Sequence, residues 1–364
     1  MDKEQLLAIV SQFTIEGRVS EIKPLGNGLI NDTFKVTTVE SEAPDYVLQH
    51  VNDAIFQNVD MLMDNIVAVT SHIRNKLESR GEKDIDRKVL SFIPAINGKY
   101  YYKDANARYW RIMRFIPDAV TKSEVTPESS YEVGLAFGDF QASLADIGTE
   151  LGETIPNFHN MEFRMKQLRE AVRDDKVGRL NEVQELVDSI EKDSFEMCQA
   201  ERMYRHGVLP KRICHCDTKV DNLMFDREGN VLCVIDLDTV MPNFVFSDIG
   251  DFLRSAANTG KEDDPNLDNV SFNMDIFRAF AQGYIKSARS FLLPVELEHI
   301  PFAARLFPFM QTVRFLADYL NGDTYYKTQY AEHNLVRSRA QWKLYQSATQ
   351  AESEMRDFVR ECML

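Results

Sequence analysis

Polar residues that could carry out one reaction are concentrated between positions 213 and 251. Asp217, Lys219 and Asn222 follow a short apolar run, and Asp236 ends the next apolar stretch. A carboxylate can orient or deprotonate a hydroxyl, and a lysine can offset developing negative charge. An amide oxygen and a second carboxylate suit a hard cation. These are the parts that phosphoryl transfer requires, because its catalysis rests on positioning and on charge neutralisation.

The spacing of these residues supports the same chemistry. Asn222 comes five positions after Asp217 (222 − 217), which is the interval in the kinase catalytic loop. A turn and a predicted strand separate Asp217 from Asp236. Side chains alternate along a strand, so Asp236 and Asp238 are expected to share a face. We therefore expect Asn222 and Asp236 to hold magnesium, with Asp238 in support.

Two further acids and one Cys-His-Cys run lie close to these residues. Asp248 and Asp251 are expected to stabilise the catalytic loop rather than to bind metal, by accepting backbone N–H bonds. The run at residues 214–216 is not expected to bind zinc, because no second ligand pair has a zinc spacing. His159 and His206 are expected to be loop or surface histidines.

The motifs resemble those of the aminoglycoside phosphotransferase superfamily, small-molecule kinases with a protein-kinase-like fold. A C-terminal block narrows the resemblance to N-acetylhexosamine 1-kinases, and the similarity runs from about residue 13 to 345. The motifs that carry it are His215-x-Asp217-Thr218-Lys219-x-x-Asn222, Ile235–Pro242, Asp248-x-Gly250-Asp251, Met310–Asp323 and Glu332–Arg337.

The resemblance implies an α+β, bilobal protein-kinase-like fold. A small antiparallel-sheet N-lobe with a helix, residues 1–116, would bind the nucleotide. A larger, mainly helical C-lobe, residues 117–364, would carry the catalytic loop, the metal site and the sugar-binding helices. The implied activity is phosphorylation of the anomeric C1 hydroxyl of an N-acetylhexosamine, GlcNAc or GalNAc, by ATP with Mg²⁺. Asp217 and Lys219 would be catalytic, and Arg314 and Tyr325 would grip the sugar.

The N-terminal part contains a glycine-rich run between two predicted strands. Gly26 and Gly28 would let the backbone approach the phosphates without a Cβ in the way, and Asn31 belongs to the same run. Hexosamine kinases carry a sugar-contacting histidine after the second glycine, whereas this chain has Leu29.

Two strand segments complete the predicted nucleotide site. Gln49 stands where protein kinases place a phosphate-pairing lysine. Its amide could donate to a phosphate oxygen, or it could be an ordinary exposed polar residue. Arg114 and Phe115 belong to a strand that resembles the hinge offering backbone groups to adenine.

Other functions remain open on sequence alone. Arg314 lies in an apolar helical stripe, where it either binds the acceptor or extends its charged end to solvent at the helix edge. Rival readings are a kinase for an aminoglycoside, choline, homoserine or methylthioribose, and a catalytically inactive nucleotide-binding regulator. The preferred hexosamine and the oligomeric state are open as well, with a monomer compatible with the sequence.

Bulk composition excludes several classes. The formal net charge of −15 argues against a nucleic-acid partner. No stretch of eighteen apolar residues occurs, so no membrane helix is expected, and the first residues do not resemble a secretory signal. Five scattered cysteines favour a reducing, cytoplasmic location over a disulfide framework.

Overall fold

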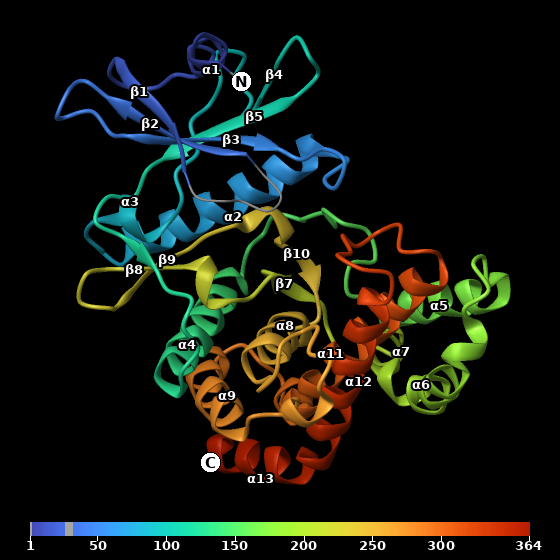
Figure 1. Ribbon diagram of the computed structural model, residues 1–364. Helices are drawn as coiled ribbons and strands as arrows, with labels where there is room; N and C mark the ends of the chain where they lie inside the picture. Colours follow the sequence, from blue (N-terminus) through green and yellow to red (C-terminus); the bar gives the residue numbers. More distant parts are fainter. Residues whose placement is uncertain (1, 26–31) are drawn as a thin grey trace. The chain divides into compact units, whose positions relative to one another are not determined.

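The computed structural model describes residues 2–25 and 32–364, which divide into two units (Figure 1). The first unit comprises the chain up to Lys122 together with Asp146–Pro156 and Asp221–Met241. The second comprises Ser123–Ala145, Asn157–Val220 and Pro242–Leu364. The predicted lobe boundary after residue 116 stays a prediction.

An antiparallel sheet forms the centre of the first unit. Its strands follow the order β1 (Val19–Pro24), β2 (Thr33–Thr38), β3 (Tyr46–Val51), β5 (Tyr109–Arg114) and β4 (Tyr102–Lys103). Alternation along β5 sends Trp110 and Ile112 into a core shared with helix α1 (Lys3–Val10). Arg111 therefore points to the opposite face, where its guanidinium lies 4.0 Å from the sulfur of Met63 on helix α2 (Val59–Ser79).

A second, smaller sheet in the first unit supports the acidic segment. It has the order β6 (Val120–Thr121), β8 (Leu223–Phe225) and β9 (Val231–Val234). The short helix α3 (Ile85–Lys88) packs against β9. Single 3₁₀ turns at Val220–Asn222 and Leu237–Thr239 precede β8 and follow β9.

The second unit is mainly helical. Strand β7 (Arg212–Cys214) pairs with β10 (Met241–Asn243) and leads into the predicted catalytic loop. The longest helix of this unit, α11 (Ile300–Leu320), is buried along nearly its whole length. The remaining helices are α4 (Pro127–Leu144), α5 (Met161–Asp174), α6 (Gln184–Met197), α7 (Gln199–Arg205), α8 (Phe246–Ala256), α9 (Met274–Ala288), α10 (Pro294–Glu298), α12 (His333–Gln350) and α13 (Glu352–Met363), with 3₁₀ turns at Leu180–Glu182 and Leu267–Asn269.

Helices α4 and α9 approach each other closely because glycines face each other across their contact. A Cβ on Gly134 would lie 2.2 Å from the Phe280 carbonyl oxygen, and one on Gly283 would lie 2.2 Å from that of Tyr131. Larger residues at these positions would separate the helices.

The predicted α+β fold, with a small antiparallel sheet and a larger helical part, is confirmed. Among the residues described, no helix is both long and apolar enough to cross a membrane.

Candidate active site

The loop that is predicted to be catalytic follows β7 directly in the second unit. Cys216 adopts a left-handed backbone conformation (φ 62°), which turns the chain just before Asp217. Asp217 is half-buried and Lys219 is exposed, and the Lys219 Nζ lies 3.0 Å from the Asp217 Oδ2. The two residues predicted to be catalytic are therefore neighbours in space, with the lysine charge beside the carboxylate.

Two carboxylates of helix α8 hold this loop by its backbone. The Asp248 carboxylate accepts the N–H groups of His215 (2.9 Å) and Cys216 (2.7 Å), and Asp251 accepts that of Thr218 (2.9 Å). Asp248 is buried, and a further bond from the Gln141 amide (2.6 Å) fixes its position. These contacts agree with the expected supporting role of both acids.

The electrostatic environment of Asp251 includes Asp217, the predicted catalytic base. Burial raises the pKa of the Asp251 carboxyl to about 7, Arg254 opposes the rise, and the charge of Asp217 adds to it. The Arg254 guanidinium lies 3.8 Å from Asp251 and makes a shorter ion pair, 2.7 Å, with Glu262.

In the first unit, the predicted alternation of Asp236 and Asp238 is wrong. Strand β9 ends at Val234, and Asp236 adopts a left-handed conformation (φ 59°) before a 3₁₀ turn. Aspartate tolerates this conformation better than most residues. The turn leaves Asp236 exposed and buries Asp238, which is 3% exposed. The two carboxylates thus have different environments.

Asp238 forms a buried ion pair with Arg111 of strand β5. The side chains are 4% and 3% exposed, and the Arg111 Nη1 donates to the Asp238 Oδ1. Sequence reasoning missed this pair. The available signal was a charge between Trp110 and Ile112 in an apolar strand, since a buried charge requires a partner.

The same arginine orients Gln49. The Arg111 Nε donates to the Gln49 Oε1 (3.1 Å), and the Gln49 Nε2 donates to the Thr33 hydroxyl (3.2 Å). These residues occupy paired positions on three neighbouring strands. Gln49 is half-buried in this chain of contacts, and its predicted contact with a phosphate stays a prediction.

The predicted metal ligands come from adjoining chain segments. The β8–β9 ladder pairs Leu223 with Val234, and the Ile235 N–H donates to the Asn222 carbonyl (2.9 Å). This ladder brings the backbone of Asn222 opposite the residue that precedes Asp236. Asn222 is 5% exposed.

An amide oxygen and a carboxylate oxygen fit magnesium, which commonly takes one or two protein ligands together with phosphate and water oxygens. Within residues 2–25 and 32–364, no cluster of three or more His, Cys, Asp or Glu residues is suited to a metal ion. The binding of magnesium by Asn222 and Asp236 stays a prediction.

Only some of the other residues predicted to contact the nucleotide belong to the described part of the chain. Gly26, Gly28 and Asn31 lie outside the described residues, as does Leu29. The Phe115 N–H donates to the Asp45 carbonyl (2.8 Å).

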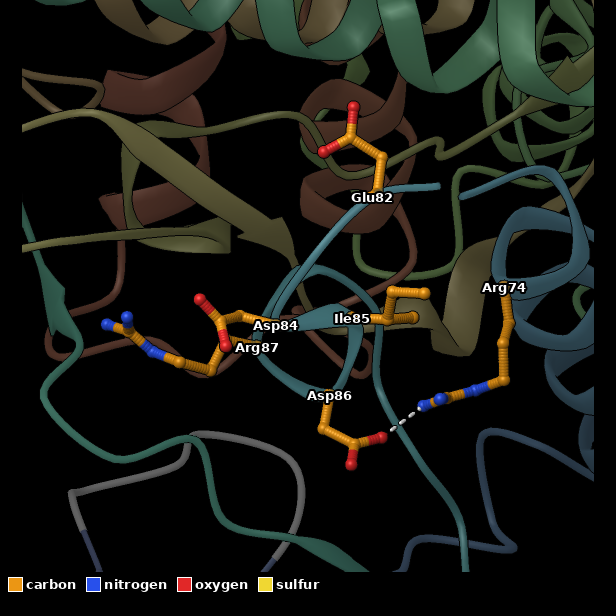
Figure 2. Close-up of a pocket in the computed structure, with 6 residues that line it drawn as sticks. All are labelled: Arg74, Glu82, Asp84, Ile85, Asp86 and Arg87. Atoms are coloured by element: carbon orange, nitrogen blue, oxygen red, sulfur yellow. Dashed lines mark hydrogen bonds and ion pairs between the residues drawn. The ribbon is translucent and has the colours of Figure 1, made fainter. Parts of the chain in front are cut away.

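The guanidinium of Arg114 lies in a network of ion pairs. It contacts Glu16 (2.8 Å) and Asp86 (3.0 Å). Figure 2 shows Asp86 pointing toward Arg74 as well, 2.8 Å away, in a pocket that is also lined by Ile85. The negative charges of the acids in this network neutralise the positive charges of the arginines.

The predicted sugar-binding residues lie in the second unit. Arg314, half-buried on α11, donates to the Gln311 side chain (2.8 Å), and its guanidinium lies 5.8 Å from the Phe158 ring and 5.7 Å from the Tyr326 ring. Tyr325 is 73% exposed, and its ring lies 4.8 Å from that of Tyr326.

The segment that presents these tyrosines is fixed by one carboxylate. Asp318, buried on α11, accepts the N–H groups of Thr324 (3.0 Å), Tyr325 (2.9 Å) and Tyr326 (3.0 Å). The Asn334 amide donates to the same carboxylate (2.9 Å). Sequence reasoning did not assign Asp318 this role, although an acid in an apolar helix was a signal.

The fold and the loop geometry define a class: small-molecule phosphotransferases with a protein-kinase-like fold. A sequence profile described as "Phosphotransferase enzyme family" (APH) matches residues 21–284, most of the chain. The chain belongs to this family.

Several solved structures share the fold. An aminoglycoside phosphotransferase from Alicyclobacillus acidocaldarius is 13% identical, with a TM-score of 0.63 over 97% of this chain and 96% of that one. An amicoumacin kinase in complex with AMP-PNP and Ca²⁺ is 15% identical, with a TM-score of 0.59 over 95% and 94%. A microcompartment-associated aminopropanol kinase is 14% identical, with a TM-score of 0.58 over 98% and 99%. At these identities the likeness establishes the fold alone.

Proposed function

We propose that this phosphotransferase uses ATP and Mg²⁺ to phosphorylate the C1 hydroxyl of an N-acetylhexosamine. The observation that carries the acceptor assignment is the setting of Arg314. Its guanidinium contacts a glutamine and two aromatic rings, and within the described part of the chain it has no ion pair with a carboxylate. A fixed fork of uncompensated donors suits the oxygens of a neutral sugar.

In this proposal Asp217 accepts a hydrogen bond from the C1 hydroxyl and takes its proton late in the transfer. Lys219, 3.0 Å from Asp217, offsets negative charge on the transferred group. Asn222 and Asp236 would hold magnesium, which would neutralise charge on the phosphates. Asp248 and Asp251 keep Asp217 in place by holding the backbone on both sides of it.

Nucleotide binding is assigned to the predicted N-lobe, residues 1–116, with Gly26, Gly28, Asn31, Gln49, Arg114 and Phe115 as the proposed contacts. The predicted C-lobe, residues 117–364, would supply the catalytic loop and the acceptor. All five cysteines are free thiols, and four are buried. This supports a cytoplasmic location.

A second candidate function is a kinase for a cationic amino alcohol. The names of two fold neighbours favour it, the aminopropanol kinase and an ethanolamine kinase from Plasmodium vivax, which has a TM-score of 0.53. The uncompensated charge of Arg314 opposes it, because a like charge repels an ammonium group.

The metal assignment predicts a change in magnesium dependence. Asp236→Ala and Asn222→Ala each remove one oxygen ligand from a cation with few protein ligands, so both variants should need more magnesium for half-maximal activity. Activity is measured across a magnesium titration at fixed ATP. Glu228→Ala, which alters an exposed acid in the β8–β9 turn, is the control and should match the wild type. An unchanged titration for Asp236→Ala would remove Asp236 from the metal site.

The acceptor assignment predicts a selective loss in KM. Arg314→Ala should raise KM for the sugar by roughly tenfold to a hundredfold, the equivalent of a charged hydrogen bond, with little change in KM for ATP. Steady-state kinetics with each substrate varied in turn measure both constants. Arg339→Ala, at an exposed position of α12, should leave both constants unchanged. Equal losses in both KM values for Arg314→Ala would contradict a specific contact with the acceptor.

A further inference from the structure

A second arginine lies in the neighbourhood of Arg314. Arg164, half-buried on helix α5, donates to the Gln167 side chain (2.8 Å) and to the Phe158 carbonyl (2.7 Å). The Arg314 guanidinium lies over the ring of the same phenylalanine. Within residues 2–25 and 32–364, neither arginine forms an ion pair with a carboxylate, and the other residues, 1 and 26–31, include no acid.

The two guanidinium groups destabilise each other. Burial and then the charge of Arg314 lower the pKa of Arg164 to about 10. The chain carries a net charge of −15, so acids to neutralise such a pair are abundant in it. The two fully buried arginines named in this structure do have acidic partners: Arg111 pairs with Asp238 and Arg305 with Glu196. An uncompensated pair indicates a place where a ligand supplies the missing acceptors.

Buried polar atoms without partners surround the same arginines. The Arg164 Nε, the His159 Nδ1 and the Tyr326 hydroxyl have no hydrogen-bond partner. His159, which was expected to be a surface or loop histidine, is only 7% exposed, because it stacks on Phe158 at 4.2 Å. Each unsatisfied buried group costs about 1–3 kcal/mol, so several in one place point to a bound polar partner.

This cluster lies beside the catalytic loop. Arg314, Arg164 and Arg254 all contribute to lowering the pKa of His159, after burial itself. Arg254 also contacts Asp251, which holds the Thr218 backbone next to Asp217. The His159 ring also lies 4.8 Å from that of Phe307, which packs against Gly250, the residue before Asp251 on α8. These contacts connect the cluster to the helix that holds the loop of Asp217.

We propose that Arg164 and Tyr326 complete the acceptor site with Arg314, and that this arginine pair selects acceptors by charge. Neutral, oxygen-rich sugars fit the site, whereas acceptors with an ammonium group are rejected. In a hexosamine the pair therefore separates the N-acetylated form from the free amine. The proposal rests on the kinase activity proposed above and adds the residues that determine its specificity.

The test compares N-acetylglucosamine with glucosamine, whose amine is protonated, in wild type, Arg164→Gln and Arg164→Lys. The wild type should favour N-acetylglucosamine by at least about 10²-fold in kcat/KM, because the two arginine charges repel the ammonium group of glucosamine. Arg164→Gln should raise KM for N-acetylglucosamine about tenfold or more and narrow this preference, with KM for ATP unchanged. Arg164→Lys should not restore the wild-type KM, because lysine lacks the planar fork of donors.

Arg169→Gln is the matched control. Arg169 lies on the same helix, but its guanidinium pairs with Glu191 at 2.7 Å and 2.9 Å. Thermal melting of each variant shows whether it is folded, and the lysine variant carries the test if the glutamine variant is not.

The possible outcomes separate the inference from the proposed function. The inference would be overturned if the Arg164 variants matched Arg169→Gln in KM for N-acetylglucosamine and in preference for it over glucosamine. It would also be overturned if the wild type phosphorylated ethanolamine or glucosamine faster than any neutral sugar. If the wild type phosphorylates a neutral sugar other than an N-acetylhexosamine and Arg164→Gln weakens its binding, the inference holds and the hexosamine assignment fails.

Discussion

Asp217→Asn is expected to lower kcat by about 10²–10⁴-fold, the contribution of a positioned general base. Asparagine has nearly the same shape, and the backbone bonds from His215, Cys216 and Thr218 to helix α8 do not involve the altered side chain. The variant should therefore fold normally and lose only the group that accepts the proton. Initial rates at saturating ATP and sugar measure the loss, and calorimetry with ADP tests whether nucleotide binding persists.

Asp221→Asn is the control for this variant, because Asp221 is an exposed acid four positions further along the chain (221 − 217). It should keep the wild-type rate. An Asp217→Asn enzyme that kept more than about a tenth of the wild-type kcat would show that Asp217 is not the catalytic base.

Arg111→Met is expected to cost about 3–5 kcal/mol of folding stability, since it removes the buried guanidinium that pairs with the Asp238 carboxylate. Asp238 is 3% exposed, so water cannot easily replace the guanidinium. The variant also removes the donor that orients Gln49. Urea denaturation followed by circular dichroism measures the change in the free energy of unfolding.

Two further variants separate the contribution of the ion pair to stability from the contribution of side-chain packing. Arg111→Met with Asp238→Leu should recover much of the lost stability, because an apolar pair of similar volume replaces a buried ion pair well. Arg18→Met breaks an ion pair with Glu40 in the same unit, but the Arg18 side chain is 80% exposed, so no measurable loss is expected. A small effect of Arg111→Met alone would mean that solvent reaches Asp238.

The sequence was most informative where function depends on short-range spacing. The catalytic loop motif placed Asp217 and Lys219 together, and the structure has them 3.0 Å apart. The backbone support by Asp248 and Asp251 also followed from position, because a carboxylate in the first turns of a helix can reach a preceding loop. The α+β fold was implied by the resemblance to a known superfamily.

Periodicity failed where the backbone leaves the regular conformation. The expectation that Asp236 and Asp238 share a face assumed a strand up to residue 238, but Asp236 turns the chain with φ 59°. A single left-handed residue ends the alternation of a strand, and the pattern of apolar residues does not reveal it.

Long-range pairing was the other limit. Arg111 and Asp238 are 127 positions apart, and nothing in either local segment names the partner. The common contact of Arg164 and Arg314 with Phe158 was missed for the same reason, because the two arginines are 150 positions apart (314 − 164). A charged residue in an apolar segment can be recognised from the sequence, but its partner can be identified only from the fold.

Identification of the phosphorylated atom tests the central claim most directly. The protein is incubated with magnesium-ATP and with GlcNAc, GalNAc, glucosamine, choline, ethanolamine or an aminoglycoside, and the product is examined by phosphorus NMR. Phosphate on the C1 hydroxyl of GlcNAc or GalNAc, with little turnover of the cationic acceptors, is the predicted result. Phosphate on O3 or O6, or turnover of a cationic acceptor and of no hexosamine, would contradict it.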